Sequence, residues 1–111
     1  MFNIYLPEFC LPILMSTSKE YTHIHNLNQY RSRRVCIRGY QDVFINYSLP
    51  SKKAYMELMI DIDDAILDCR DSKKDYELSK KGLMVQNVYD YIYHMKNTLE
   101  EDITEVIEEY E

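Results

Sequence analysis

The sequence predicts an α+β protein, with an antiparallel β-sheet or hairpin in its N-terminal half followed by two or three α-helices, the last one long. Apolar residues alternate with a period of two before about residue 50, and they recur at intervals of three and four after it. The chain has 111 residues, of which 46% are hydrophobic and 29% charged, values typical of a globular protein. We therefore expect a single domain over residues 1–111.

The clearest β pattern lies between residues 33 and 48. Val35 and Ile37 alternate with less apolar residues, and so do Val43 and Ile45. The connection over residues 39–42 contains a glycine, as tight turns prefer, so we predict a β-hairpin here. Residues 21–27 also alternate and could supply a third strand. Residues 2–6 could supply a fourth, since the proline that follows suits a sheet edge.

The second half has helical spacing. Ser51 is a good N-cap, and the apolar spacing after it predicts an amphipathic helix over about 51–70. A short helical piece is expected over 75–81, with Gly82 suited to a helix C-cap. The apolar residues from Val85 to Tyr110 predict a last helix of some 26 residues, about 40 Å long, part of which would project or pack on a second copy.

Charge divides the chain into a basic and an acidic half. Residues 1–50 hold five Lys and Arg and three Asp and Glu, whereas residues 51–111 hold eight and sixteen, which together give the net charge of -6. Four arginines fall within eight residues, between two tyrosines. These six residues are our candidates for nucleic-acid binding, because arginine binds phosphate and tyrosine stacks on bases: Tyr30, Arg31, Arg33, Arg34, Arg38 and Tyr40.

The acidic half offers a second candidate surface, for a protein partner. Tyr89, Tyr91 and Tyr93 cannot all face one core on a helix, and residues 100–111 contain seven acidic residues and no basic one. We take these three tyrosines together with Glu108 and Glu109 as candidate partner-binding residues. The same acidic segment could instead repel nucleic acid or cover the arginines in the absence of a ligand.

Catalytic, metal and cofactor sites are not expected. With two glycines in the chain, a phosphate-cradling loop is close to excluded, and no nucleophile motif occurs. The His23 and His25 pair on a strand, or the carboxylates Asp61, Asp64 and Asp68 on one helix face, would each form only half a metal site. We therefore expect no enzymatic activity.

Location and origin are constrained only loosely. No apolar run is long enough for a bilayer, and three cysteines without a C-x-x-C pair fit a reduced, intracellular location such as the cytoplasm or nucleus of a host cell. Eleven tyrosines and eleven isoleucines beside two glycines are typical of an AT-rich genome, such as that of a large virus or phage.

Two segments read together resemble a known family. Val35-Cys-Ile-Arg38-Gly-Tyr40-Gln-Asp-Val43-Phe-Ile45-Asn46 is followed by Ile62-Asp-Asp-Ala-Ile66. This order and spacing resemble the single-stranded-DNA-binding domain of the transcriptional coactivators known as positive cofactor four, over about residues 21–68. The resemblance implies a dimer made by helices, a curved sheet that binds unpaired strands, and phosphate and stacking roles for Arg38 and Tyr40. One strand of the family domain has no counterpart between the hairpin and the helix.

The sequence therefore supports a leading hypothesis for the function and one alternative. The first is a non-catalytic, homodimeric cofactor of transcription or replication that binds single-stranded DNA or RNA, in the manner of those coactivators. The alternative is an acidic protein-binding module, such as a viral or phage inhibitor or adaptor of a host protein, in which electrostatics favours fast and specific association.

Overall fold

A computed structural model describes residues 1–17, 19–68, 80–96, 98 and 100–110. Its four β-strands form one antiparallel sheet in the order β1-β3-β2-β4. The strands are β1 (Phe2–Pro7), β2 (Arg31–Ile37), β3 (Val43–Leu49) and β4 (Ile103–Glu109). The α-helices are α1 (Leu11–Met15), α2 (Thr22–His25), α3 (Lys52–Asp68) and α4 (Lys80–Met95), with three short 3-10 turns, η1 (Glu8–Cys10), η2 (Asn26–Tyr30) and η3 (Glu100–Asp102). The α+β class is confirmed.

The predicted hairpin is confirmed as β2 and β3. Gly39 in the connection has a φ of +88°, a left-handed conformation that costs glycine little. The backbone amide of Tyr40 donates to the Ile37 oxygen at 3.1 Å and closes the turn. β1 pairs with β3 and forms one edge of the sheet, as its proline suggested.

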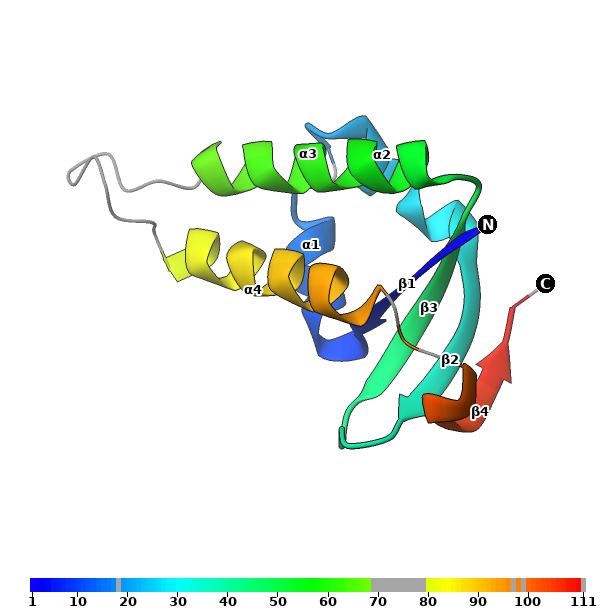
Figure 1. Ribbon diagram of the computed structural model, residues 1–111. Helices are drawn as coiled ribbons and strands as arrows, with labels where there is room; N and C mark the ends of the chain where they lie inside the picture. The colour runs from blue at the N-terminus through cyan, green and yellow to red at the C-terminus, as the bar shows by residue number, and fades with distance from the viewer. Residues whose placement is uncertain (18, 69–79, 97, 99, 111) are drawn as a thin grey trace.

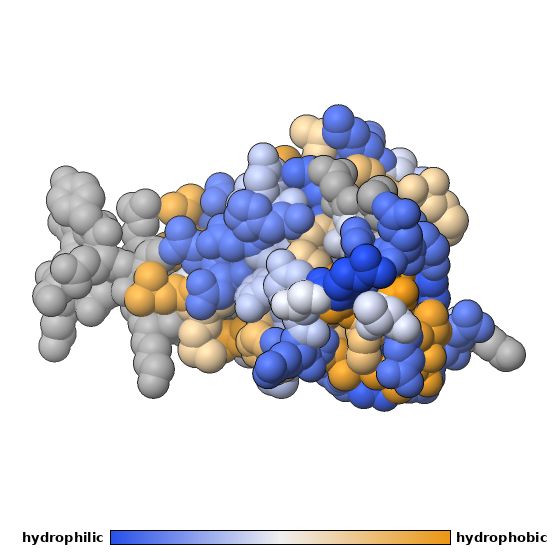
Figure 2. All heavy atoms as spheres, turned by 60° about the horizontal axis from the view of Figure 1, so that its bottom comes forward, coloured by the Kyte–Doolittle hydropathy of each residue, from blue (hydrophilic) through white to orange (hydrophobic). Residues whose placement is uncertain are grey.

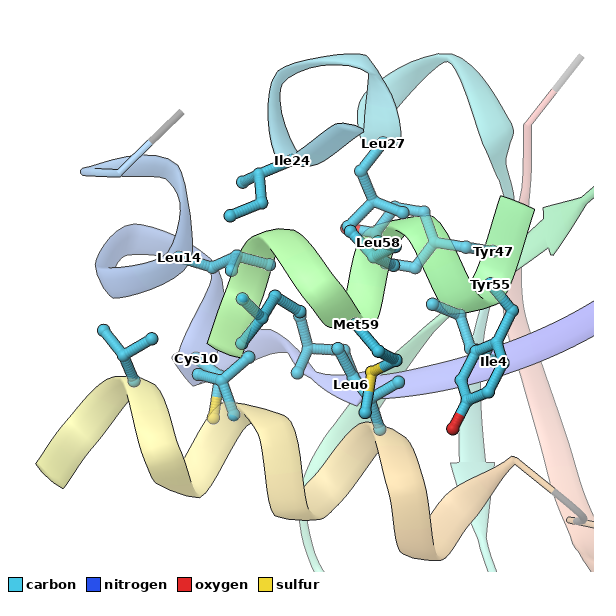
Figure 3. Close-up of a cluster of buried hydrophobic side chains, with 14 of the residues drawn as sticks. Ile4, Leu6, Cys10, Leu14, Ile24, Leu27, Tyr47, Tyr55, Leu58 and Met59 are labelled. Atoms are coloured by element: carbon cyan, nitrogen blue, oxygen red, sulfur yellow. The ribbon is translucent and has the colours of Figure 1, made fainter. Parts of the chain in front are cut away.

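The helices α3 and α4 lie side by side and pack against the part of the sheet formed by β1 and β3 (Figure 1). Alternate residues of β1 divide between two buried clusters, as strand geometry requires. Ile4 and Leu6 belong to the larger cluster, which takes in side chains of β3, α1, α2, α3 and α4, and several of them are drawn in Figure 3. Tyr5 belongs to a smaller cluster with Phe44 and with Met95 at the end of α4.

The predicted helix over 51–70 is confirmed as α3. The Ser51 hydroxyl accepts the backbone N–H of Ala54 at 3.2 Å, as an N-cap does. Leu58, Ile62 and Ala65 on one side of α3 are buried. The predicted helix over 75–81 lies outside the described residues except for its last two, which begin α4. Gly82 is a buried residue of α4, so the prediction that it caps a helix C-terminus is wrong.

Two further predictions are corrected. Residues 22–25 form helix α2 and 26–30 a 3-10 turn, not a third strand. Ile24 and Leu27 are three residues apart, so these helical turns bury both in the core. The predicted 26-residue helix ends at Met95, where the Thr98 amide and hydroxyl both donate to the Met95 oxygen. The chain then forms β4 on the outside of β2.

The strand β4 is favoured over a helix by its contacts. Its β-branched residues suit a strand, and pairing with β2 places Glu108 opposite Arg34 and Glu109 opposite Arg33. Cross-strand pairs of opposite charge stabilise a sheet. In an isolated helix the same acids would have crowded together without partners.

Candidate functional site

The arginine cluster lies on β2, between β3 and the acidic strand β4 (Figure 1). Arg31, Arg33 and Arg34 are half-buried there, whereas Arg38 follows the strand and is exposed. The four residues thus divide into three that contact acidic or aromatic groups of this chain and one that is largely open to solvent.

Arg33 is bound from two sides. Its Nη1 and Nη2 lie 2.5 and 3.1 Å from the two carboxylate oxygens of Glu100, a bidentate geometry, and its Nε donates to Oδ1 of Asn46 at 3.1 Å. Asn46 is buried and also donates to the Ile4 oxygen. The hydrogen bond to Arg33, with its charge, lowers the pKa of Glu100, and the same contact raises the pKa of Arg33.

Arg34 links two distant segments. Its Nη2 is 2.9 Å from Oε2 of Glu8, just after β1, and its Nη1 is 3.3 Å from Oε2 of Glu108 on β4. Hydrogen bonding to Glu8 raises the pKa of Arg34, although burial opposes the change. One guanidinium therefore joins the N-terminal segment to the C-terminal strand.

Arg31 contacts an aromatic residue. Its Nη2 donates to the Tyr110 hydroxyl at 2.7 Å, and its Cζ lies 4.4 Å from the centroid of the same ring. Tyr30, its neighbour, packs against the larger buried cluster. Neither side chain is thus fully available to an external ligand.

Arg38 and Tyr40 remain accessible, and Tyr40 lines a shallow cavity. The Tyr40 ring is 47% exposed and meets Phe44 edge-on at 5.3 Å. A cavity of about 260 Å³ is lined by Tyr40 and by residues of α4, which are Asn87, Asp90, Tyr91, His94 and Met95. Arg38 contacts the backbone of η3, before β4, its Nη2 lying 3.5 Å from the Glu101 oxygen.

Acid should weaken the attachment of the C-terminal segment to β2. A carboxylate whose pKa is lowered on folding stabilises the fold above its ordinary value of 4.5, and this stabilisation disappears as the pH falls through the lower, folded value. Between about pH 5 and pH 3 the midpoint of urea unfolding should thus fall less steeply in Glu100→Gln than in the wild type. Parallel curves for the two proteins would contradict a stabilising role for this ion pair.

The strand β4 is the most exposed part of the sheet. From Thr104 to Glu109 every residue is exposed, and Val106 and Ile107 each retain 42% of their surface. Figure 2, which brings the lower side of Figure 1 forward, shows hydrophobic residues directly beside hydrophilic ones at the sheet end of the molecule. Within the described part of the chain β4 pairs with β2 alone, so its outer edge is unpaired.

The direction of the Glu109 backbone amide follows from the hydrogen bond that the next residue, Tyr110, makes. The amide of Tyr110 donates to the oxygen of Ser32, a residue of β2, at 2.8 Å. Successive residues of an extended strand direct their backbone groups to opposite sides, so the amide of Glu109 points to the free edge. The pairing of β4 with β2 is irregular at two positions before Glu108, because Thr104 and Ile107 have no directly opposite partner on β2.

The candidate tyrosines on α4 have three different environments. Tyr93 is half-exposed, with the Lys96 ammonium 3.5 Å above its ring, and Tyr89 borders a groove between α3 and α4. Tyr91 packs against both buried clusters and meets Phe9 edge-on. The structure brings none of them next to Glu108 or Glu109, which lie on β4, so the five residues do not form one surface.

The histidine and carboxylate candidates have structural contacts. His23 lies on α2, not on a strand, and its two ring nitrogens are each 3.0 Å from a carboxylate on α3, those of Glu57 and Asp61. Asp68 accepts a hydrogen bond from the Tyr21 hydroxyl. These contacts attach α2 to α3. No group of three or more His, Cys, Asp or Glu that could hold a metal ion occurs in the described ranges.

The partners of the arginines were missed as individual residues. Glu8, Glu100 and Tyr110 carry no motif, and only the acidic balance of the C-terminal segment indicated that it could lie over the arginines. Their pairing is set by sheet register, which sequence spacing alone did not reveal.

Comparison with known proteins identified no relative. The chain matches no family model, no curated protein and no solved structure. Nor do the described residues include a helix long and apolar enough to span a membrane.

Proposed function

We propose that this protein is an acidic protein-binding module that takes up a basic, extended segment of its partner as an additional strand on the free edge of β4. The observation that carries the proposal is an edge strand exposed from Thr104 to Glu109 with an unpaired outer side. Such an edge presents backbone donors and acceptors to another chain, and β-strand addition uses them for affinity.

The charges on β4 favour a basic partner. Natural edge strands are often protected by lysine or proline, whereas this one carries Glu105, Glu108 and Glu109 and no basic residue. Of these three glutamates, Glu108 alone forms an ion pair within the described chain, with Arg34. The other two carboxylates are therefore available to lysine or arginine, while Val106 and Ile107 add apolar contact area.

The arginines support this reading better than the nucleic-acid reading. Three of the four are engaged by Glu8, Glu100, Glu108 and Tyr110, so they hold β4 in place and leave its acidic residues outermost. Phosphate binding through them would require breaking these contacts first. Arg38 and Tyr40 remain exposed, and Tyr40 lines a cavity, so these two residues favour single-stranded nucleic acid as a second candidate.

The test uses a labelled peptide of alternating lysine and valine, titrated with the full chain in fluorescence anisotropy. Glu109→Pro removes the outward amide and the charge, whereas the matched variant Glu109→Gln removes the charge alone. We expect Glu109→Pro to weaken binding by at least about tenfold and Glu109→Gln by about two- to threefold. Far-ultraviolet circular dichroism should be the same for all three proteins.

Two outcomes would contradict strand addition. One is equal affinity of Glu109→Pro and the wild type, and the other is equal binding of a peptide in which glutamate replaces lysine. A labelled single-stranded oligonucleotide is titrated alongside. Salt-sensitive binding of that oligonucleotide, lost in Arg38→Glu, would place nucleic acid ahead of a protein partner.

A further inference from the structure

The cavity between the β2–β3 turn and α4 combines aromatic rings with a carboxylate. Its volume is about 260 Å³, and its lining consists of two tyrosines, a histidine, a methionine, an asparagine and one acid: Tyr40, Asn87, Asp90, Tyr91, His94 and Met95. Binding sites for small molecules are typically apolar and aromatic, with a few polar groups that fix the ligand. We call this space the α4 cavity.

The residues of α4 reach the cavity because of their spacing. Asn87, Tyr91 and His94 recur at intervals of four and three, so they share one side of the helix. Val88 and Ile92 lie on another side and are buried in the larger cluster. The core therefore holds α4 in position while its polar and aromatic side faces the turn.

The two tyrosine rings are held by contacts with phenylalanines that do not line the cavity. Tyr40 meets the buried Phe44 at 5.3 Å and Tyr91 meets Phe9 at 6.1 Å, both in edge-to-face geometry. Tyr40 nevertheless remains 47% exposed. Accessible aromatic rings in fixed positions attract cations, and alkylated ammonium ions are bound in this way.

The acidic groups around the cavity also favour a positive ligand. Asp90 is exposed and forms no ion pair or side-chain hydrogen bond within the described residues. Asp42 lines the neighbouring cavity with Phe9, and it too has no ion pair in this part of the chain. Both carboxylates thus keep their full charge available to a ligand.

The basic side chains closest in sequence to the lining residues have other contacts. Arg38 lies against the Glu101 oxygen, and the Lys96 ammonium lies over the ring of Tyr93. Neither residue lines the α4 cavity. A nucleotide in the cavity would bring its phosphate close to acidic groups, which disfavours nucleic acid at this position.

We propose that the α4 cavity binds a quaternary ammonium group, such as the trimethylammonium of choline or of a trimethylated lysine. This group carries its charge without N–H donors, so it needs no hydrogen-bond acceptors when tyrosine rings surround it. Its methyl groups contact the rings of Tyr40 and Tyr91, and Asp90 supplies the opposite charge. The site goes beyond the proposed function, since it does not involve β4.

The first test is an NMR chemical-shift titration of the full chain with choline at about pH 8, because a protonated His94 would repel a cation. The comparison ligand is dimethylbutanol, which has the shape of choline but no charge. We expect choline to bind at least about tenfold more tightly. Equal affinity for the two ligands would overturn the proposal, as would the absence of choline binding at about 50 mM.

Three variants connect that binding to the cavity. Tyr40→Ala and Asp90→Asn should each raise the Kd for choline by at least about fivefold, with circular dichroism unchanged. The matched control is Asp64→Asn, which removes the same charge at an exposed residue of α3 outside the cavity and should have no effect. An oligonucleotide that displaces choline, and binds Asp90→Asn more tightly than the wild type, would instead assign the cavity to nucleic acid.

A second titration distinguishes the two sources of the ligand. A peptide with trimethyllysine that binds more tightly than choline would identify a side chain of a protein partner, and the reverse order would identify a free small molecule. Equal binding of the same peptide with unmodified lysine would contradict a quaternary ammonium site. Glu109→Pro should bind choline as the wild type does, so failure of strand addition on β4 leaves this result unaffected.

Discussion

Replacing Tyr47 by alanine should lower the free energy of unfolding by about 3–5 kcal/mol, whereas Tyr47→Phe should leave it unchanged or raise it by about 1 kcal/mol. Tyr47 lies on β3 in the larger cluster and is 0% exposed. Alanine would remove the entire ring and its hydroxyl group and leave a cavity among side chains of the sheet and α3. Urea unfolding followed by circular dichroism measures both differences.

The opposite expectation for phenylalanine rests on the hydroxyl group. The Tyr47 oxygen is buried and has no hydrogen-bond partner in the part of the chain that the structure describes. Burial also raises the pKa of this phenol, so the group stays neutral in the fold. A buried hydroxyl without a partner costs free energy, which phenylalanine would recover. A loss of more than about 1 kcal/mol in Tyr47→Phe would contradict this account.

Arg33→Met should lower the free energy of unfolding by about 1–3 kcal/mol. Methionine would fill part of the volume, but the buried Asn46 would lose its donor and Glu100 its bidentate partner. The expected cost comes mainly from Asn46, since Glu100 is exposed and can return to water. Hydrogen exchange of the β4 amides should also become faster, because the segment before β4 is attached through this arginine.

The matched control is Arg38→Met, which alters an exposed arginine of the same cluster. It should leave both unfolding and β4 exchange unchanged. Equal effects of the two variants would mean that Arg33 does not attach the C-terminal segment. Arg33 would then be a candidate for binding an external ligand. Comparison of Arg33→Met with Arg38→Met thus tests whether Arg33 stabilises the fold or is available to bind an external phosphate.

Local sequence patterns were sufficient to predict many of the helices and strands of this fold. Alternation with a turn glycine predicted β2 and β3, the N-cap Ser51 and the apolar spacing predicted α3, and a terminal proline predicted β1 at an edge. The prediction of a strand over residues 21–27 was wrong, because Ile24 and Leu27 are three residues apart and a short helical turn buries both.

The candidate site was predictable in composition but not in arrangement. The sequence indicated a basic strand and an acidic segment, and the arginines of one do contact the acids of the other. Which residues pair depends on the register of β4 against β2, including its two irregular positions. Spacing within either segment carries no information on that register, because the partners are more than sixty residues apart in the chain.

Periodicity and composition within short windows were sufficient to predict the α+β class, the hairpin, the first long helix and the separation of charge. In contrast, the strand over residues 103–109 and the contacts of three arginines with groups of the same chain depend on the fold as a whole. The spacing of Val106, Ile107 and Tyr110 suits a helix and a strand almost equally. The choice came from hydrogen bonds and ion pairs offered by β2, a partner distant in sequence.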